Sequence, residues 1–191
     1  HCYCVIMAGG TGVRFWPVSR AAKPKQFLDV VGTGKTFIQN TYERSLKAVP
    51  KENILIVTGE RYRDIVMEQL PELESRNLLL EPYARNTAPC IAYATYTLLK
   101  RDPEARMVVT PSDHMIENEE LFVETICNAF ESIEEKDVLM TLGVLPTRPD
   151  TNYGYVQAYG GSDVYKSDKP MQVKTFTEKP DKELAKVFIS T

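Results

Sequence analysis

The 191-residue sequence contains neither a long apolar run nor a dense set of cysteines. No stretch approaches the roughly 18 uninterrupted apolar residues of a spanning helix, so we expect no membrane partner. The first residues lack the pattern of a secretory signal, and we therefore expect a cytoplasmic protein. Four cysteines are too few and too scattered for a disulfide scaffold. They form no CxxC pair, and the two histidines do not complete a zinc-binding set. We expect reduced thiols, mostly packed in the core.

Acidic residues are missing from one end of the chain. Residues 1–28 contain two arginines and two lysines but no carboxylate, so this segment carries +4. Because the whole chain carries −3, the remaining 163 residues carry −7. One positive segment in an acidic protein favours a small anionic ligand there. It argues against nucleic acid as a partner, since that requires a broader basic surface. The sequence leaves the oligomeric state open and allows a homo-oligomer.

Short β-branched runs alternate with helical patterns along the chain. Such alternation predicts an α/β domain with a doubly wound, mostly parallel (mixed) sheet of the Rossmann-like type. We assign residues 2–191 to one domain, which breaks off inside a helical pattern and is therefore expected to be incomplete at its C-terminal end. The predicted strands cover residues 3–8, 53–58, 77–81, 107–110, 137–144, 154–159 and 173–178. The predicted helices cover residues 36–49, a segment around 65–70, a segment after 86, 119–134 and 181–190.

A glycine-rich segment, AGGTG at residues 8–12, follows the first predicted strand. Glycines at the carboxyl end of a strand let backbone N–H groups approach an anion. The segment is not a dinucleotide-binding fingerprint, because the position of the third glycine is Phe15. A second segment, GTGKT at 32–36, is not a phosphate-binding P-loop, because Asp29 stands where its first glycine is required. We interpret that segment as a turn, with Thr36 and Gln39 forming a capping box.

Other polar residues lie at predicted strand ends. Asp113 follows the strand at 107–110 and is placed to hold Mg²⁺, which needs only one or two protein carboxylates beside phosphate oxygens. Asn86 and Thr87 precede a helix that has Pro89 in its first turn. Each of these residues also fits a plain structural role as a cap, a turn or a surface ion pair. The residues around each position do not decide between the ligand-binding role and the structural role.

The order of these segments resembles the sugar-1-phosphate nucleotidyltransferases, and most closely their mannose-1-phosphate guanylyltransferase branch. The resemblance runs from about residue 5 to 181. It is carried by AGGTGVRFWPVSR, PKQF, EPYARNTAP, PSDH, GVLPTRPDTNYGY and FTEKP, which begin at residues 8, 24, 81, 111, 143 and 176.

The resemblance implies an enzyme that makes GDP-mannose and pyrophosphate from GTP and mannose 1-phosphate with Mg²⁺. It implies that Arg14 binds the leaving phosphates, Lys25 stabilises charge at the α-phosphate and Asp113 ligates Mg²⁺. The implied nucleotide-binding residues are Gly9, Gly10, Thr11, Gly12, Glu81, Asn86 and Thr87. The implied sugar-phosphate-binding residues are Gly154, Tyr155, Glu178 and Lys179.

One departure from the family pattern is visible. Members carry a second metal-binding aspartate and an asparagine-serine-glycine stretch beyond the EKP segment, and neither occurs before Thr191. A chain limited to these residues is therefore expected to bind nucleotide but to turn over poorly. Two other interpretations stay open: transfer between another nucleotide and sugar phosphate, or a non-catalytic paralogue that binds sugar nucleotides.

Overall fold

The computed structural model describes residues 1–10, 15–83, 85–134, 136–160 and 169–190. The chain divides into two compact units, His1–Phe130 and Glu131–Thr191, and each is described by itself.

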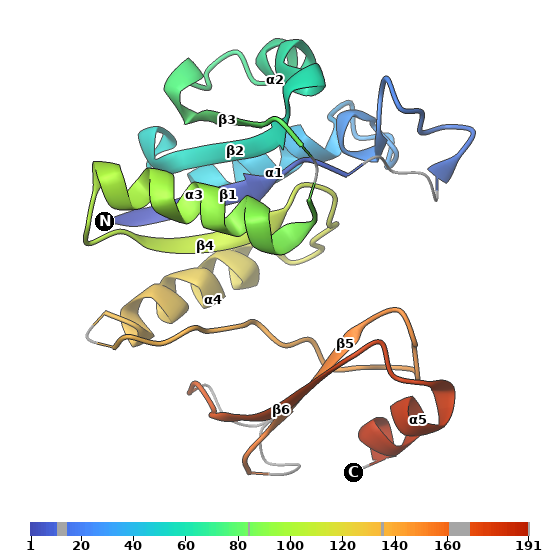
Figure 1. Cartoon of the computed structure of the whole chain (residues 1–191). Helices are drawn as coiled ribbons and strands as arrows, with labels where there is room; N and C mark the ends of the chain where they lie inside the picture. The colour runs from blue at the N-terminus through green and yellow to red at the C-terminus, as the bar shows by residue number, and fades with distance from the viewer. Residues whose placement is uncertain (11–14, 84, 135, 161–168, 191) are drawn as a thin grey trace. The chain divides into compact units, whose positions relative to one another are not determined.

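The first unit is built on a parallel sheet of four strands (Figure 1). The strands are β1 (Cys2–Met7), β2 (Ile54–Gly59), β3 (Leu78–Glu81) and β4 (Arg106–Pro111), in the order β3-β2-β1-β4. Met7 pairs with Val57 on one side and with Pro111 on the other, so the strands end at one common edge. This arrangement confirms the predicted α/β class with a parallel sheet.

Three helices connect successive strands of this sheet, and a fourth follows β4. They are α1 (Phe37–Leu46), α2 (Arg63–Gln69), α3 (Thr87–Arg101) and α4 (Glu119–Ser132). Short 3₁₀ turns η2 (Lys25–Phe27), η3 (Lys51–Asn53), η4 (Glu60–Tyr62) and η5 (Ser75–Asn77) stand between the longer elements. The predicted helices agree with this order, although the first ends three residues earlier than expected, at Leu46.

Both faces of the sheet are covered, which makes it doubly wound. Successive strand residues point to opposite faces, so Val5 of β1 packs with Ala94 and Leu98 of α3 in one buried cluster. On the other face, the Sγ of Cys4 lies 3.3 Å from the Oγ of Ser45 in α1. The hydrophobic residues of the two central strands, β1 and β2, are thus mostly buried on both sides, as is typical of parallel sheets.

The loop before α1 shows why GTGKT is a turn. The carboxylate of Asp29 accepts hydrogen bonds from the backbone N–H groups of Gly32, Thr33 and Gly34 at 2.7, 3.0 and 2.7 Å. Loss of hydration raises the pKa of this carboxyl, but the backbone donors outweigh it and bring the pKa below its usual value. The backbone N–H groups of this loop are therefore already occupied by the carboxylate of Asp29. Helix α1 then begins after Thr36, whose N–H is bonded by Gln39 Oε1 at 2.9 Å, as the capping box predicts.

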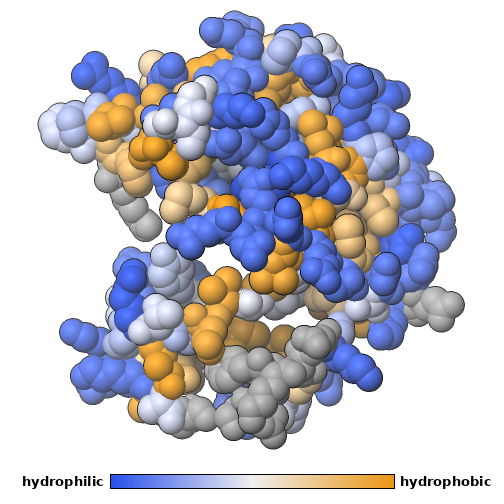
Figure 2. All heavy atoms as spheres, turned by 180° about the vertical axis from the view of Figure 1, so that it is seen from behind, coloured by the Kyte–Doolittle hydropathy of each residue, from blue (hydrophilic) through white to orange (hydrophobic). Residues whose placement is uncertain are grey.

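The second unit contains an antiparallel pair and one helix. Strands β5 (Gly154–Ala158) and β6 (Val173–Glu178) pair so that Gly154 stands opposite Glu178, and α5 (Lys182–Ser190) follows. Hydrophobic side chains occur among the exposed residues of the molecule, as the orange atoms between hydrophilic ones show (Figure 2).

The prediction of a strand over residues 137–144 is wrong. Residues 136–146 adopt neither helix nor strand, and the side chains of Leu139 and Val144 are exposed. A strand needs a hydrogen-bonded neighbour, and among the described residues the strand pairs do not include this segment. Also among the described residues, no helix combines the length and apolar character needed to cross a bilayer.

Candidate functional site

The candidate site begins where β1 and β3 end at the common edge of the sheet. Gly9 lies two residues after the end of β1, and a Cβ added to it would lie 3.4 Å from Oε2 of Glu81, the last residue of β3. A carboxylate from another strand thus borders the glycine loop, while a Cβ added to Gly10 would meet open space. Burial raises the pKa of the Glu81 carboxyl above its usual value.

Lys25 and Asp113, 88 residues apart in the sequence, come together at this edge. The Lys25 Nζ lies 3.5 Å from Asp113 Oδ2 and donates to the Asp113 carbonyl oxygen at 3.3 Å. The ammonium also lies 4.7 Å from the centre of the Phe15 ring and 4.9 Å from that of Phe37. The structure therefore places the predicted phosphate-binding cation beside the predicted metal ligand.

Two residues that hold the glycine loop were missed in the sequence. Gln26 Nε2 donates to the carbonyl oxygens of Ala8 and Gly10 at 3.0 and 2.8 Å, and Thr58 Oγ1 donates to that of Ala8 at 2.8 Å. Gln26 stands in the PKQF segment beside Lys25, but nothing in the sequence shows that it is buried. A buried amide needs partners, and that requirement would have pointed to it had its burial been known.

One of the residues after β3, Asn86, has an unusual backbone conformation. Asn86 adopts φ 68° and ψ −169°, a region that L-residues rarely occupy. It stands at the N-cap position of α3, yet among the described residues its side chain makes no capping bond. Thr87 is the first residue of the helix, and both side chains are exposed. The predicted cap position is confirmed, whereas side-chain capping by Asn86 is not.

The predicted sugar-phosphate residues gather on the β5–β6 pair. A Cβ on Gly154 would lie 2.8 Å from Glu178 Oε2, and Lys179 Nζ lies 3.3 Å from Glu178 Oε1. Lys179 has a positive φ of 45°. The Tyr155 hydroxyl accepts from the Asp150 N–H at 2.9 Å and donates to the Asp150 carbonyl at 3.0 Å, so it braces the preceding loop.

Three predicted residues, Thr11, Gly12 and Arg14, lie outside the described residues. Among the described residues, no group of three or more histidines, cysteines, aspartates or glutamates is arranged to hold a metal. Asp113 offers one carboxylate, paired with Lys25 and with 40% of its side chain exposed. One carboxylate suits Mg²⁺ when phosphates and water complete its shell.

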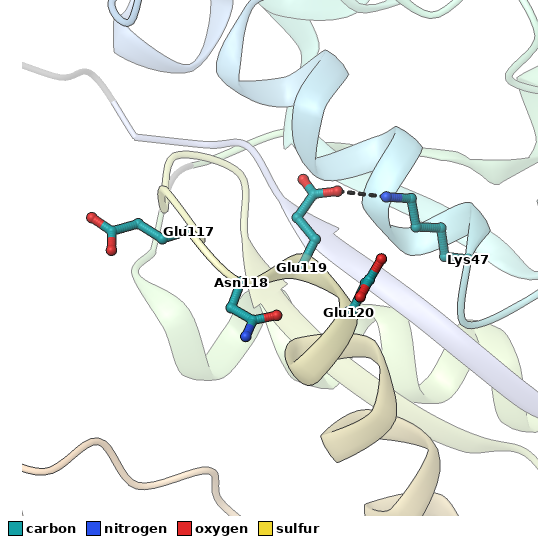
Figure 3. Close-up of a pocket in the computed structure, with 5 residues that line it drawn as sticks. All are labelled: Lys47, Glu117, Asn118, Glu119 and Glu120. Atoms are coloured by element: carbon teal, nitrogen blue, oxygen red, sulfur yellow. Dashed lines mark hydrogen bonds and ion pairs between the residues drawn. The ribbon is translucent and has the colours of Figure 1, made fainter.

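A hollow of about 460 Å³ lies elsewhere on the first unit (Figure 3). Lys47 and residues 117–120 line it, and Lys47 Nζ contacts Glu119 Oε2 at 2.7 Å. Three glutamates against one lysine make it unsuitable for phosphates, and none of the predicted site residues lines it.

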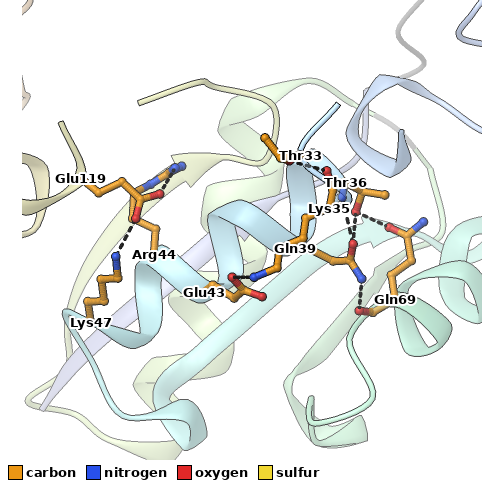
Figure 4. A network of polar contacts seen from close by, with 9 residues as sticks. All are labelled: Thr33, Lys35, Thr36, Gln39, Glu43, Arg44, Lys47, Gln69 and Glu119. Atoms are coloured by element: carbon orange, nitrogen blue, oxygen red, sulfur yellow. Dashed lines mark hydrogen bonds and ion pairs between the residues drawn. The ribbon is translucent and has the colours of Figure 1, made fainter. Parts of the chain in front are cut away.

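The same glutamate belongs to a structural network around α1 (Figure 4). Arg44, whose side chain is 3% exposed, reaches Glu119 Oε1 at 3.6 Å. The hydrogen bond from Lys47, together with Arg44, holds the pKa of Glu119 below its usual value. This network joins α1 to the start of α4 and serves packing.

Comparisons with known proteins agree with the predicted class. The sequence model of a family described as nucleotidyl transferase matches residues 3–191. A mannose-1-phosphate guanylyltransferase of Klebsiella pneumoniae is 39% identical over 98% of this chain and 39% of its own length. One from Escherichia coli K12 is 38% identical over 99% of this chain and 40% of its own length.

A solved structure from Thermus thermophilus, described as a mannose-1-phosphate geranyltransferase, gives a TM-score of 0.88 at 33% identity. The match covers 99% of this chain and 53% of that one. The chain thus spans about two fifths of the curated relatives and about half of the solved structure.

Proposed function

Because the chain belongs to the nucleotidyl transferase family, we propose that it transfers the guanylyl group of GTP to mannose 1-phosphate and releases pyrophosphate. The names of the curated relatives support this choice of substrates. The family match also supports the proposal that residues 2–191 form one nucleotidyltransferase domain, since it spans both units.

The observation that carries the proposal is the pairing of Lys25 with Asp113 beside the glycine loop. In a parallel α/β sheet, ligands bind outside the carboxyl ends of the strands, and this pair lies there. A cation and a metal-binding carboxylate 3.5 Å apart can share one phosphate group, with the ammonium on an oxygen and the carboxylate toward a bound cation.

The proposed reaction needs positioning and charge neutralisation more than covalent help from the protein. An oxygen of mannose 1-phosphate attacks the α-phosphorus of GTP, and a new P–O bond forms. The bond between that phosphorus and the oxygen leading to the β-phosphate breaks, and pyrophosphate leaves with the bonding electrons. The attacking phosphate is already ionised at neutral pH, so no general base is needed. Lys25 would donate to an α-phosphate oxygen as its negative charge grows.

The metal in this proposal is Mg²⁺, with Asp113 as its ligand from the described residues. When bound, the cation would neutralise phosphate charge and help align the leaving group. The fit rests on the exposed carboxylate of Asp113 and on its place after β4. The neighbouring Lys25 would keep the local charge balanced while Asp113 holds the cation.

The nucleotide and sugar contacts are also proposed. Glu81 borders Gly9, and its carboxylate can accept hydrogen bonds from donors on a base or ribose. In the second unit, Glu178 can accept from sugar hydroxyls while Lys179 donates to the sugar phosphate. A Cβ on Gly154 would lie 2.5 Å from Phe176 Cζ and 2.8 Å from Glu178 Oε2, so a side chain there would displace both of these groups.

The direct test is pyrophosphate release by the full-length protein with GTP, mannose 1-phosphate and Mg²⁺. Asp113→Asn keeps the shape of the side chain and removes its charge, so we expect about a 100-fold or larger loss of turnover. An Asp113→Asn protein with unchanged metal dependence would contradict the metal assignment.

A panel of nucleoside triphosphates and sugar 1-phosphates addresses the alternatives. Faster turnover with another pair would replace GTP and mannose 1-phosphate as substrates. Binding of sugar nucleotides without pyrophosphate release from any pair would indicate a non-catalytic paralogue. The presence of both Lys25 and Asp113 argues against that outcome.

A further inference from the structure

The side chain of Gln26 ties the PKQF segment to the glycine loop. Gln26 is 3% exposed and follows Lys25 in η2. Its Nε2 donates to the carbonyl oxygens of Ala8 and Gly10 at 3.0 and 2.8 Å. A side-chain amide carries two N–H donors, and each of these carbonyls can take one. The two N–H donors of Gln26 therefore bind the carbonyl groups of the two residues that flank Gly9.

These bonds decide which way the loop peptides face. The Ala8 carbonyl also accepts from Thr58 Oγ1 at 2.8 Å, so two buried side chains hold it toward the interior. In a trans peptide the C=O and the following N–H point in opposite directions. The N–H of Gly9 therefore points away from Gln26 and Thr58.

We propose that Gln26 is a positioning residue for the nucleotide: it holds the loop carbonyls inward so that backbone N–H groups face the phosphates. This inference rests on the proposed function, because it requires a polyphosphate at the loop. Backbone N–H groups are effective anion ligands only when they converge on the anion. If a loop peptide were reversed, its N–H would point inward and its carbonyl oxygen would face the phosphate and repel it. Gln26 acts through the backbone and need not touch the substrate.

The test compares two substitutions that remove the donors. Gln26→Glu keeps the size but turns acceptor oxygens against two carbonyl oxygens, and Gln26→Leu removes the polar group. We expect kcat/KM for GTP to fall by about 10- to 100-fold, as for loss of one or two buried bonds. The KM for mannose 1-phosphate should change by less than about twofold, because the bonds that are lost belong to the nucleotide loop.

Asn77→Leu is the matched control. Asn77 is 1% exposed, and its Nδ2 donates to the Glu52 carbonyl at 2.8 Å, far along the chain from the loop. Asn77→Leu should lower the melting temperature and leave both KM values unchanged. If Gln26→Glu or Gln26→Leu behaves like Asn77→Leu, Gln26 has only a structural role and the inference is overturned.

Two further outcomes separate the inference from the proposed function. A wild-type protein that releases no pyrophosphate contradicts the proposed function whatever Gln26 does. If the Glu and Leu variants do not fold, Gln26→Asn decides, since it keeps the amide on a side chain one methylene shorter. A selectively raised KM for GTP in that variant supports positioning, and unchanged KM values for both substrates overturn it.

Discussion

Replacing Lys25 by methionine should separate catalysis from stability. Methionine keeps the length of the unbranched stem and removes the ammonium. Removing one preorganised charge from a developing phosphate charge costs about 10²- to 10³-fold in kcat, or about 2.7–4 kcal/mol of activation free energy. We therefore expect Lys25→Met to lower the rate of pyrophosphate release by that factor at saturating substrates.

The cost in stability is expected to be much smaller. The Lys25–Asp113 pair spans 3.5 Å with side chains 20% and 40% exposed, and such a partly solvated pair contributes about 0–1 kcal/mol. The contacts with the Phe15 and Phe37 rings, at 4.7 and 4.9 Å, add about 0.5–1 kcal/mol each when exposed. Methionine also packs well against rings, which offsets part of this loss. Lys25→Met should lose about 1–2 kcal/mol of unfolding free energy at most.

Lys35→Met is the matched control, because Lys35 makes a shorter ion pair away from the predicted site. Its Nζ lies 2.6 Å from Glu43 Oε2, and both side chains are 49% exposed. Pyrophosphate release and denaturant unfolding should be measured for both variants. Equal loss of turnover in the two variants, or more than half of wild-type turnover in Lys25→Met, would refute the role of Lys25.

Three more perturbations have expected results. Asn86→Gly removes backbone strain of about 1–3 kcal/mol at φ 68°, and the conformational entropy of glycine in the unfolded chain offsets part of this gain. The melting temperature should therefore rise, and the KM for GTP should increase. Glu119→Gln leaves the buried Arg44 without a charged partner and should cost about 1–3 kcal/mol of unfolding free energy. Because the pKa of Glu119 is lowered in the folded state, its ionised form stabilises the fold at neutral pH. The unfolding free energy measured at decreasing pH should lose this contribution below the usual pKa of 4.5 in wild type. Glu119→Gln should not show this loss. Burial raises the pKa of the Cys4 and Cys90 thiols from 9.0 to about 11. The unfolding free energy should therefore fall between pH 9 and 11, by up to about 1.4 kcal/mol per pH unit for each thiol. Replacing both cysteines by alanine should flatten this dependence on pH.

The parallel sheet was predictable because its strands leave a strong local signal. Runs such as CVI in β1 and ILIV in β2 are buried on both faces, and a continuous apolar run records that burial directly. The segment at 137–144 has a similar composition and forms no strand, because pairing depends on a neighbour that composition does not specify. The sequence therefore predicts apolar segments better than it predicts which of them find a partner.

The site was predictable only in part, for a related reason. Asp113 was identified by its type and its place after a strand, whereas the role of Lys25 was inferred from the family resemblance. Their contact follows from the shared edge of the sheet. Gln26 and Thr58 carry no local sign of their role, since only the folded loop turns two carbonyls toward them. Charged residues that are candidates for ligand binding can be found in the sequence, whereas neutral side chains that orient the backbone become visible only in the structure.

The two glycine-rich loops of the first unit show why glycine content alone does not define an anion site. The loop at 32–34 directs three N–H groups inward onto the carboxylate of Asp29, so its capacity for an anion is already filled. The loop at Gly9 has its carbonyl groups held inward by Gln26, and a lysine lies at the same edge of the sheet. The first arrangement closes a turn, and for the second we propose that the N–H groups bind an external anion. The direction of the peptide groups, set by Asp29 in one loop and by Gln26 and Thr58 in the other, distinguishes the structural turn from the loop that we propose for the nucleotide.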